Sequence, residues 1–168
     1  IIEVRKKFQN ENKHEIGPYF YSQYVAALSK NLATICPEDL NVVILSNIGS
    51  EAMEQAIKMV ERYHGPERSK LIYARNSFHG RTKGALSITD SKALRNSFRL
   101  VKGDFIVDFD NIEQIVQLLS QNKEIGGVVL ESIQGGAGVV VPRNGYLADV
   151  RKICDKYEVL LVIDESHV

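Results

Sequence analysis

The stretch that decides the fold is GVVLESIQGGAGVVVPRNGYLADVRKICDKYEVLLVIDE, which covers residues 127–165. It holds apolar runs at 127–130 and 159–163, a glycine-rich loop at 134–138, and apolar residues at helical spacing over 146–157. Short apolar runs between turn residues are typical of buried strands, and the helical spacing predicts an amphipathic helix. The stretch therefore predicts a strand, a helix and a second strand, in that order.

The same alternation extends toward the N-terminus. We expect further strands at 42–45, 70–74 and 105–109, and helices at 19–35 and 111–120. Another helix is expected to begin after Ser46–Gly49 and to end at His64-Gly65-Pro66. Its apolar residues on one face are Ala52, Ala56, Met59, Val60 and Tyr63. Alternating strands and helices predict an α/β fold, with a mostly parallel sheet and helices on both faces. Since no repeat or linker divides the chain, we expect one domain over residues 1–168. Ligands of such sheets bind outside the carboxyl ends of the strands.

The composition restricts the classes of partner. Lys plus Arg and Asp plus Glu both total 21, so no net charge would attract nucleic acid or an anionic membrane. Ile1–Asn10 has no continuous apolar run, which argues against a signal peptide or a spanning helix. Cys36 and Cys154 lack the spacing of a metal or redox pair, so we interpret them as packing thiols of a cytoplasmic protein. The absence of an initial Met suggests a fragment.

The first run whose residues are suited to ligand binding is Ser46-Asn47-Ile48-Gly49-Ser50-Glu51-Ala52, at a strand-to-helix turn. A helix N-terminus offers unpaired N–H groups, and a glycine there lets a phosphate approach the backbone. Ser50 adds a hydroxyl. By pattern alone the alternative is more common, with Ser50 as an N-cap and Gly49 as a turn residue.

The second run is Ser77-Phe78-His79-Gly80-Arg81-Thr82, in a loop after a strand. Phe78 beside His79 is suited to stacking on a planar heterocycle, and Gly80 gives clearance for it. The alternative is a surface loop with one anchoring Phe and a solvated His.

Two further runs follow strands and carry carboxylates. Glu131 precedes the loop Gln134–Gly138 and can line a polar site, or belong to a plain strand-to-helix connection. Asp164-Glu165 follows the last strand. A buried carboxylate there can keep a pyridine nitrogen protonated. The alternatives are a helix cap or a metal-binding pair, although the sequence singles out no further hard oxygen ligands.

Together and in this order, the four runs resemble the class III pyridoxal-phosphate (PLP) aminotransferases, the family of ornithine, acetylornithine, putrescine and 4-aminobutyrate aminotransferases. Gly84-Ala85-Leu86-Ser87 and the run Val139–Leu147 resemble the family as well, whereas 1–41 and 99–124 match loosely. The resemblance implies part of the large domain of the fold type I (aspartate aminotransferase-like) enzymes.

The resemblance also implies roles for particular residues. Gly49 and Ser50 would bind the cofactor phosphate, Phe78 would stack on the pyridine ring, and His79 would lie beside it. Glu131 would be a carboxylate near the ring, Asp164 would pair with the pyridine nitrogen, and His167 would reach the ring hydroxyl in place of the usual glutamine. No metal ligand is implied.

Four positions depart from the family pattern: Ile48 replaces Ser or Thr, Ser132 replaces proline, Gly136 replaces the glutamate of ornithine-type members, and Ser166 replaces an apolar residue under the ring. The first removes a hydroxyl near the phosphate, and Gly136 argues against an ornithine-like specificity.

The resemblance places the Schiff-base lysine a few tens of residues after the Asp-Glu run, and therefore beyond Val168. The N-terminal substrate-contacting segment and the C-terminal small domain are expected to be missing as well. We therefore expect no catalytic residue within this chain, and no turnover by the chain alone.

The implied parent enzyme moves an amino group from an omega-amino acid or diamine donor to an oxo acid such as 2-oxoglutarate, as a homodimer. The alternatives are a PLP-dependent aminomutase or decarboxylase of the same fold, and a noncatalytic interaction module. A nucleotide-binding α/β domain is a weaker alternative, because no glycine-rich dinucleotide motif is present.

Overall fold

A computed structural model describes residues 1–11, 22–37, 40–101 and 103–167. The chain forms two compact units, Ile1–Leu45 and Ser46–Val168. The sheet and both hydrophobic clusters described below belong to the second unit. The expectation of one domain over the whole chain remains a prediction.

The first unit contains the helices α1 (Ile2–Asn10) and α2 (Gln23–Ile35), and neither helix has a buried residue. The helix expected at 19–35 is confirmed from Gln23 onward, and its first residues, 19–21, lie outside the described part. Ser22 caps α2, since its Oγ accepts a hydrogen bond from the Val25 N–H. No described helix of the chain is long and apolar enough to cross a membrane.

The strand expected at 42–45 is wrong. These residues form neither helix nor strand, and Val42 is 81% exposed. The β-branched side chains favour an extended backbone, but a strand needs a neighbour that accepts and donates its ladder hydrogen bonds. No described strand pairs with this segment.

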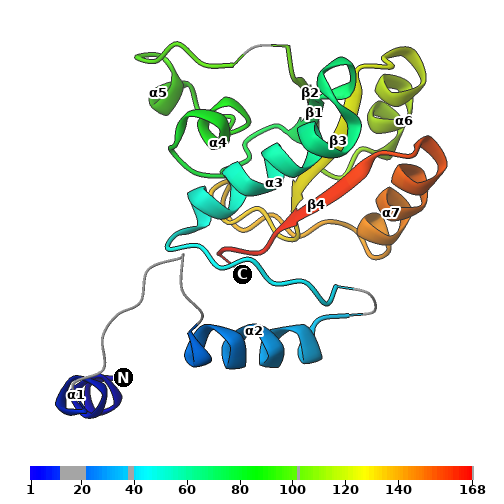
Figure 1. The fold of residues 1–168 in the computed structure, drawn as a ribbon. Coiled ribbons are helices and arrows are strands. Elements are labelled where there is room, and N and C mark those ends of the chain that lie inside the picture. Colours follow the sequence, from blue (N-terminus) through cyan, green and yellow to red (C-terminus); the bar gives the residue numbers. More distant parts are fainter. Residues whose placement is uncertain (12–21, 38–39, 102, 168) are drawn as a thin grey trace. The chain divides into compact units, whose positions relative to one another are not determined.

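The second unit is built on four parallel strands in the order β2-β1-β3-β4 (Figure 1). Their bounds are β1 (Lys70–Ala74), β2 (Phe105–Val107), β3 (Ile125–Glu131) and β4 (Leu160–Asp164). Every residue of β3 is buried, as expected for an inner strand of a parallel sheet covered on both faces. The predicted fold class is therefore confirmed.

Helices cover both faces of this sheet (Figure 1). The helices α6 (Ile112–Gln121) and α7 (Tyr146–Tyr157) pack on the face that holds Ile72, Val128 and Leu130. The helices α3 (Gly49–His64) and α4 (Lys83–Ser87) pack on the opposite face, against Leu71, Tyr73 and Val129. The short helices η1 (Pro66–Arg68) and α5 (Lys92–Arg95) complete the unit.

Helix α3 packs through a different stripe from the one expected from the sequence. Met53 and Val60 are buried with Ile57 against the sheet, whereas Met59 is 45% exposed and Tyr63 is 72% exposed. Both sets of residues follow the helical period. Periodicity alone does not decide which of two apolar stripes faces the core.

The two cysteines also differ from each other. Cys154 lies on α7 and is buried in the core, and burial raises the pKa of its thiol to about 12. Cys36 is exposed. The interpretation as a packing thiol is confirmed for Cys154 and wrong for Cys36, which follows the last residue of α2, a helix with no buried residues.

Candidate active site

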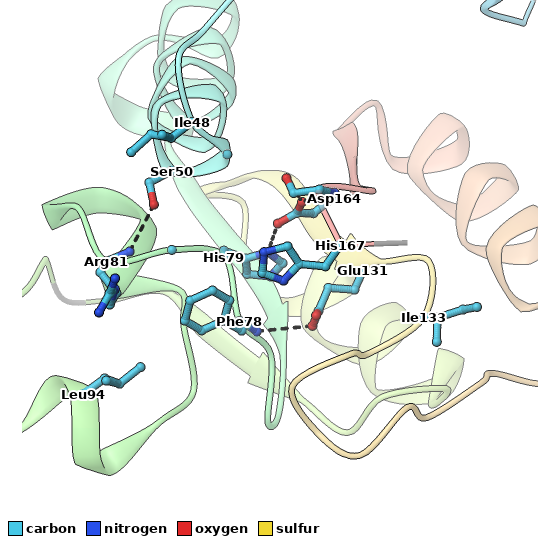
Figure 2. A pocket seen from close by; sticks show the side chains of 13 residues that line it. Ile48, Ser50, Phe78, His79, Arg81, Leu94, Glu131, Ile133, Asp164 and His167 are labelled. Carbon is cyan, nitrogen blue, oxygen red and sulfur yellow. Dashed lines mark hydrogen bonds and ion pairs between the residues drawn. The ribbon is translucent and has the colours of Figure 1, made fainter. Parts of the chain in front are cut away.

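A cavity of about 480 Å³ lies beside the carboxyl ends of β1, β3 and β4 and the start of α3 (Figure 2). In a parallel sheet these strand ends meet at one edge, so residues distant in sequence come together there. All the cofactor-binding residues implied by the resemblance line this cavity: Gly49, Ser50, Phe78, His79, Glu131, Asp164 and His167. The structure thus places them together, while their binding roles remain predictions.

The start of α3 forms one end of the cavity. Ile48 is the N-cap residue, with extended backbone and no side-chain cap, so the alternative in which Ser50 caps the helix is wrong. The first N–H groups of a helix have no carbonyl partner in the preceding turn. The Ile48 side chain offers them no oxygen, although the Ile48 carbonyl accepts a hydrogen bond from the Glu51 N–H at 3.1 Å. This end presents backbone N–H groups and a positive helix dipole, the features that bind an anion.

The loop after β1 crosses close to this helix start. Ser50 Oγ accepts a hydrogen bond of 3.3 Å from the Arg81 N–H. Gly80 has a φ of +126°, and a Cβ atom there would lie 2.2 Å from Ser50 Oγ. Only glycine fits this backbone conformation and this approach. The loop 77–82 is therefore an ordered part of the site, and His79, which is 2% exposed, is not solvated.

Asp164 and His79 form a buried pair that lines the same cavity. His79 Nδ1 lies 2.8 Å from Asp164 Oδ2, and the side chains are 0% and 6% exposed. Burial would raise the pKa of Asp164, but hydrogen bonds from His79 and Ser166 outweigh it and hold the pKa below its usual value. Asp164 is therefore a buried carboxylate that stays ionised at neutral pH. His79 Nε2 is buried without a hydrogen-bond partner among the described residues.

Glu131 lies at the end of β3, in register with Asp164 on β4. Its Oε2 accepts a hydrogen bond of 3.3 Å from the Phe78 N–H. Burial, together with the charge of Asp164, raises the pKa of Glu131, although His79 and the Phe78 N–H oppose this shift. The cavity thus contains two carboxyl groups whose pKa values are shifted in opposite directions.

The aromatic side chains give the cavity flat walls. The rings of Phe78 and His167 are nearly parallel, with an interplanar angle of 17° and centroids 5.8 Å apart. Figure 2 shows Phe78 on the loop after β1, with its backbone N–H directed toward Glu131. A planar ligand ring can therefore be held against an aromatic face.

Six further residues line the cavity: Ile48, Gly80, Arg81, Leu94, Ile133 and Ser166. The sequence had already placed Ile48, Gly80 and Ser166 near the ligand without a binding role, and it assigned no role to Arg81, Leu94 and Ile133. Arg81 belongs to the loop already singled out, and a cation beside a helix N-terminus was a usable signal for an anionic ligand. Leu94 comes from α5, and no sequence pattern connected it to the site. The glycines at 135 and 136 do not line the cavity. The described residues contain no cluster of three metal-ligating side chains.

Comparisons with known proteins identify the family and the fold. The sequence model of the family "aminotransferase class-III" matches residues 1–167. The structure of adenosylmethionine-8-amino-7-oxononanoate aminotransferase from Methanocaldococcus jannaschii superposes with a TM-score of 0.88 at 30% identity over 98% of this chain. The structure of an ornithine aminotransferase from Toxoplasma gondii superposes with a TM-score of 0.81 at 28% identity over 92% of the chain. An omega-transaminase from Thermomicrobium roseum gives 0.83 at 26% identity over 96%.

The chain covers only part of each of these structures. It spans 40% of the Methanocaldococcus protein, 38% of the Toxoplasma protein and 42% of the Thermomicrobium protein. The Toxoplasma enzyme holds PLP at partial occupancy in its active site.

Proposed function

Because the chain belongs to the class III aminotransferase family, we propose that it is the cofactor-binding part of a PLP-dependent transaminase. The observation that carries this proposal is the buried His79–Asp164 pair, which lines the same cavity as the start of α3. The parent enzyme would move an amino group from an amine donor to an oxo acid. When bound, PLP supplies an electron sink for a carbanion beside its ring.

The residues present fit this cofactor. PLP has a protonatable ring nitrogen at one end and a phosphate at the other. Asp164 offers an ionised carboxylate for the nitrogen, and the Gly49 and Ser50 end of α3 offers N–H donors and a hydroxyl for the phosphate. Ile48 contributes no hydroxyl for the phosphate. The exposed Arg81 guanidinium, which also lines the cavity, offers a positive charge for it.

Each side chain then has a physical task. Asp164 keeps the ring nitrogen protonated, because a buried carboxylate favours a positive partner. His79 holds Asp164 in its ionised form and in a fixed orientation. Phe78 covers one face of the ring and limits the approach of water. His167 lies parallel to Phe78, and its expected hydrogen bond to the ring hydroxyl is part of the proposal.

Glu131 is suited to a different task. Its raised pKa favours a neutral carboxyl group more than an ordinary glutamate does. We infer that it would act as a hydrogen-bond donor near the ring.

The Schiff-base lysine is expected outside these residues. None of the described residues that line the cavity is a lysine. The proposal therefore assigns the lysine to the longer enzyme and expects no transamination by residues 1–168 alone. A homodimer and a cytoplasmic location belong to the same proposal, by analogy with the family.

The donor is proposed as an omega-amino acid or diamine, with 2-oxoglutarate as acceptor. This rests on the resemblance and on the neighbours, which include an ornithine aminotransferase and an omega-transaminase. A Cβ atom at Gly136 would lie 3.5 Å from Phe78 Cβ, an ordinary contact. The absent glutamate therefore leaves space beside Phe78, which suits donors without the charge pattern of ornithine.

Cofactor binding is the first test. PLP added to the ligand-free protein should bind and change its absorbance. The Asp164→Asn variant should bind at least about tenfold more weakly, because it loses the charge that pairs with the ring nitrogen. Asp155→Asn, on the exposed side of α7, is the matched control. Equal affinities of the wild type and Asp164→Asn would contradict the assigned role.

Turnover by the parent enzyme is the second test. Ornithine, putrescine and 4-aminobutyrate should each be assayed with 2-oxoglutarate, with glutamate measured as the product. Release of carbon dioxide or a rearranged amine without glutamate would support the decarboxylase or aminomutase instead. Failure of the parent to bind PLP would support the interaction module.

A further inference from the structure

Ser166 contacts the buried carboxylate directly at the end of β4. Asp164 Oδ1 accepts a hydrogen bond of 3.0 Å from the Ser166 N–H and one of 2.6 Å from the Ser166 hydroxyl. The second oxygen, Oδ2, is bound by His79. Each oxygen of Asp164 therefore has its own partner, so that rotation of the carboxylate would break hydrogen bonds on both sides.

Ser166 also lies against the start of α3. A Cβ atom on Gly49 would be 2.9 Å from Ser166 Oγ and 3.2 Å from Ser166 Cβ. The hydroxyl thus occupies the space that a side chain at 49 would need. Ser166 therefore lies between the Asp164 carboxylate and Gly49, the first residue of α3.

We propose that Ser166 is a positioning residue, whose hydroxyl orients the Asp164 carboxylate and keeps it ionised before any ligand binds. Its place against Gly49 also fixes the distance between this carboxylate and the start of α3. The proposal rests on the proposed function only where it gives Asp164 a pyridine nitrogen as partner. The hydrogen bond itself does not depend on the cofactor.

The effect of the Ser166 hydroxyl on the pKa of Asp164 can be separated from the effects of the charged groups that face Asp164. The ionisable groups are His79, from the loop after β1, and Glu131, from β3. Ser166 is uncharged, so its replacement changes hydrogen bonding without changing the net charge of the cluster. The Ser166 hydrogen bonds are among the interactions that lower the pKa of Asp164, and loss of the hydroxyl should therefore raise it.

The first experiment uses the ligand-free protein. The carboxyl carbon of Asp164, assigned by its loss in Asp164→Asn, is titrated by ¹³C NMR in the wild type, Ser166→Ala, Ser166→Thr and Ser120→Ala. We expect Ser166→Ala to raise the apparent pKa of Asp164 by about one pH unit. Ser166→Thr keeps the hydroxyl and should remain close to the wild type, as should the exposed control Ser120→Ala. Should Ser166→Ala fail to fold, Ser166→Gly removes the same hydroxyl.

The second experiment measures PLP affinity in the same variants. Ser166→Ala should bind about tenfold more weakly, and Ser166→Thr should recover most of this loss. An unchanged titration, or a shifted titration with unchanged PLP affinity, would overturn the positioning role. If the wild type itself does not bind PLP, the proposed function fails, and the titration still decides whether Ser166 holds Asp164.

Discussion

The His79 and Asp164 side chains at this site are both buried and hydrogen-bonded to each other. His79 and Asp164 are far apart in sequence, yet both side chains are almost fully buried and bonded at 2.8 Å. A buried ion pair costs free energy to desolvate, and this cost is offset only when the geometry and the remaining hydrogen bonds are good. The contact is short and Ser166 satisfies the second oxygen of Asp164, whereas His79 Nε2 has no partner among the described residues.

Removal of His79 should leave Asp164 buried and poorly compensated. We expect His79→Ala to lower the free energy of unfolding by about 3 kcal/mol, as is typical when one partner of a buried pair is lost. Urea unfolding at pH 7 measures the change. The double variant His79→Ala/Asp164→Ala should be more stable than the sum of the single changes predicts, since no unpaired charge remains. Strict additivity would show that the pair is not coupled.

Gly80 sets how closely the loop after β1 approaches α3. Gly80→Ala should destabilise the protein by about 2–3 kcal/mol, because its φ of +126° is strained for any residue with a Cβ atom and that atom would overlap Ser50 Oγ. It should also weaken PLP binding. Gly135→Ala is the matched control, since a Cβ atom there meets nothing within 4 Å. Equal unfolding midpoints for the two variants would contradict this geometry.

At the scale of elements, Glu54 joins two helices that carry parts of the site. It lies on α3, and its Oε1 accepts hydrogen bonds from the Gly84 N–H at 2.7 Å and the Ala85 N–H at 3.1 Å, in the first turn of α4. Burial would raise the pKa of Glu54, but the nearby Thr82 hydroxyl and the hydrogen bonds from these two amides lower it overall. The carboxylate thus caps α4 from outside and fixes the end of the loop 77–82.

The Glu54→Gln variant should lose about 1–2 kcal/mol of stability, as expected when the charge is removed from hydrogen bonds of this kind. The effect depends on pH. The pKa of Glu54 is lower in the folded state than in the unfolded state, where it is about 4.3. The ionised carboxylate therefore stabilises the fold above the unfolded pKa, and this stabilisation is lost as the pH falls through the folded pKa. The wild type and Glu54→Gln should therefore converge in stability toward pH 3. Glu61→Gln, exposed on the same helix, should change little, and a constant difference across pH would contradict the cap.

At the scale of the whole molecule, the core belongs to the second unit. Both hydrophobic clusters lie between Met53 and Ile163, whereas α1 and α2 contain no buried residue. Most of the favourable free energy of folding comes from burial of apolar area. Most of the buried apolar area that stabilises the described chain therefore comes from residues after 45.

A chain that begins at Ser46 should fold without the first unit. We expect its unfolding free energy to remain within about 1 kcal/mol of that of the full chain, because no described core residue is removed. Thermal and urea unfolding followed by circular dichroism measure this. A Leu130→Ala variant, which removes a fully buried core side chain, should lose about 3 kcal/mol and serves as the positive control. Loss of cooperative unfolding in the truncated chain would contradict the expected independence.

Local patterns in the sequence were sufficient for most of the elements and for the location of the site. The helices at 112–121 and 146–157 and the strands β1, β3 and β4 follow from periodicity and turn residues. The four runs point to the carboxyl ends of the strands, where the candidate cavity lies, because parallel strands bring these ends together. The family resemblance is likewise carried by sequence alone.

Only the tertiary structure decided which residues touch. Periodicity predicted one apolar face on α3, and of its residues only Val60 is buried, with Met53 and the partly buried Ile57 in place of the others. The apolar run at 42–45 had strand character but no partner, since pairing depends on a neighbour that local sequence does not specify. His79 and Asp164 are 85 positions apart, and they pair only because their two segments meet at one strand end. The sequence by itself determined most of the elements and the family, and the packing of those elements determined the electrostatics of the site.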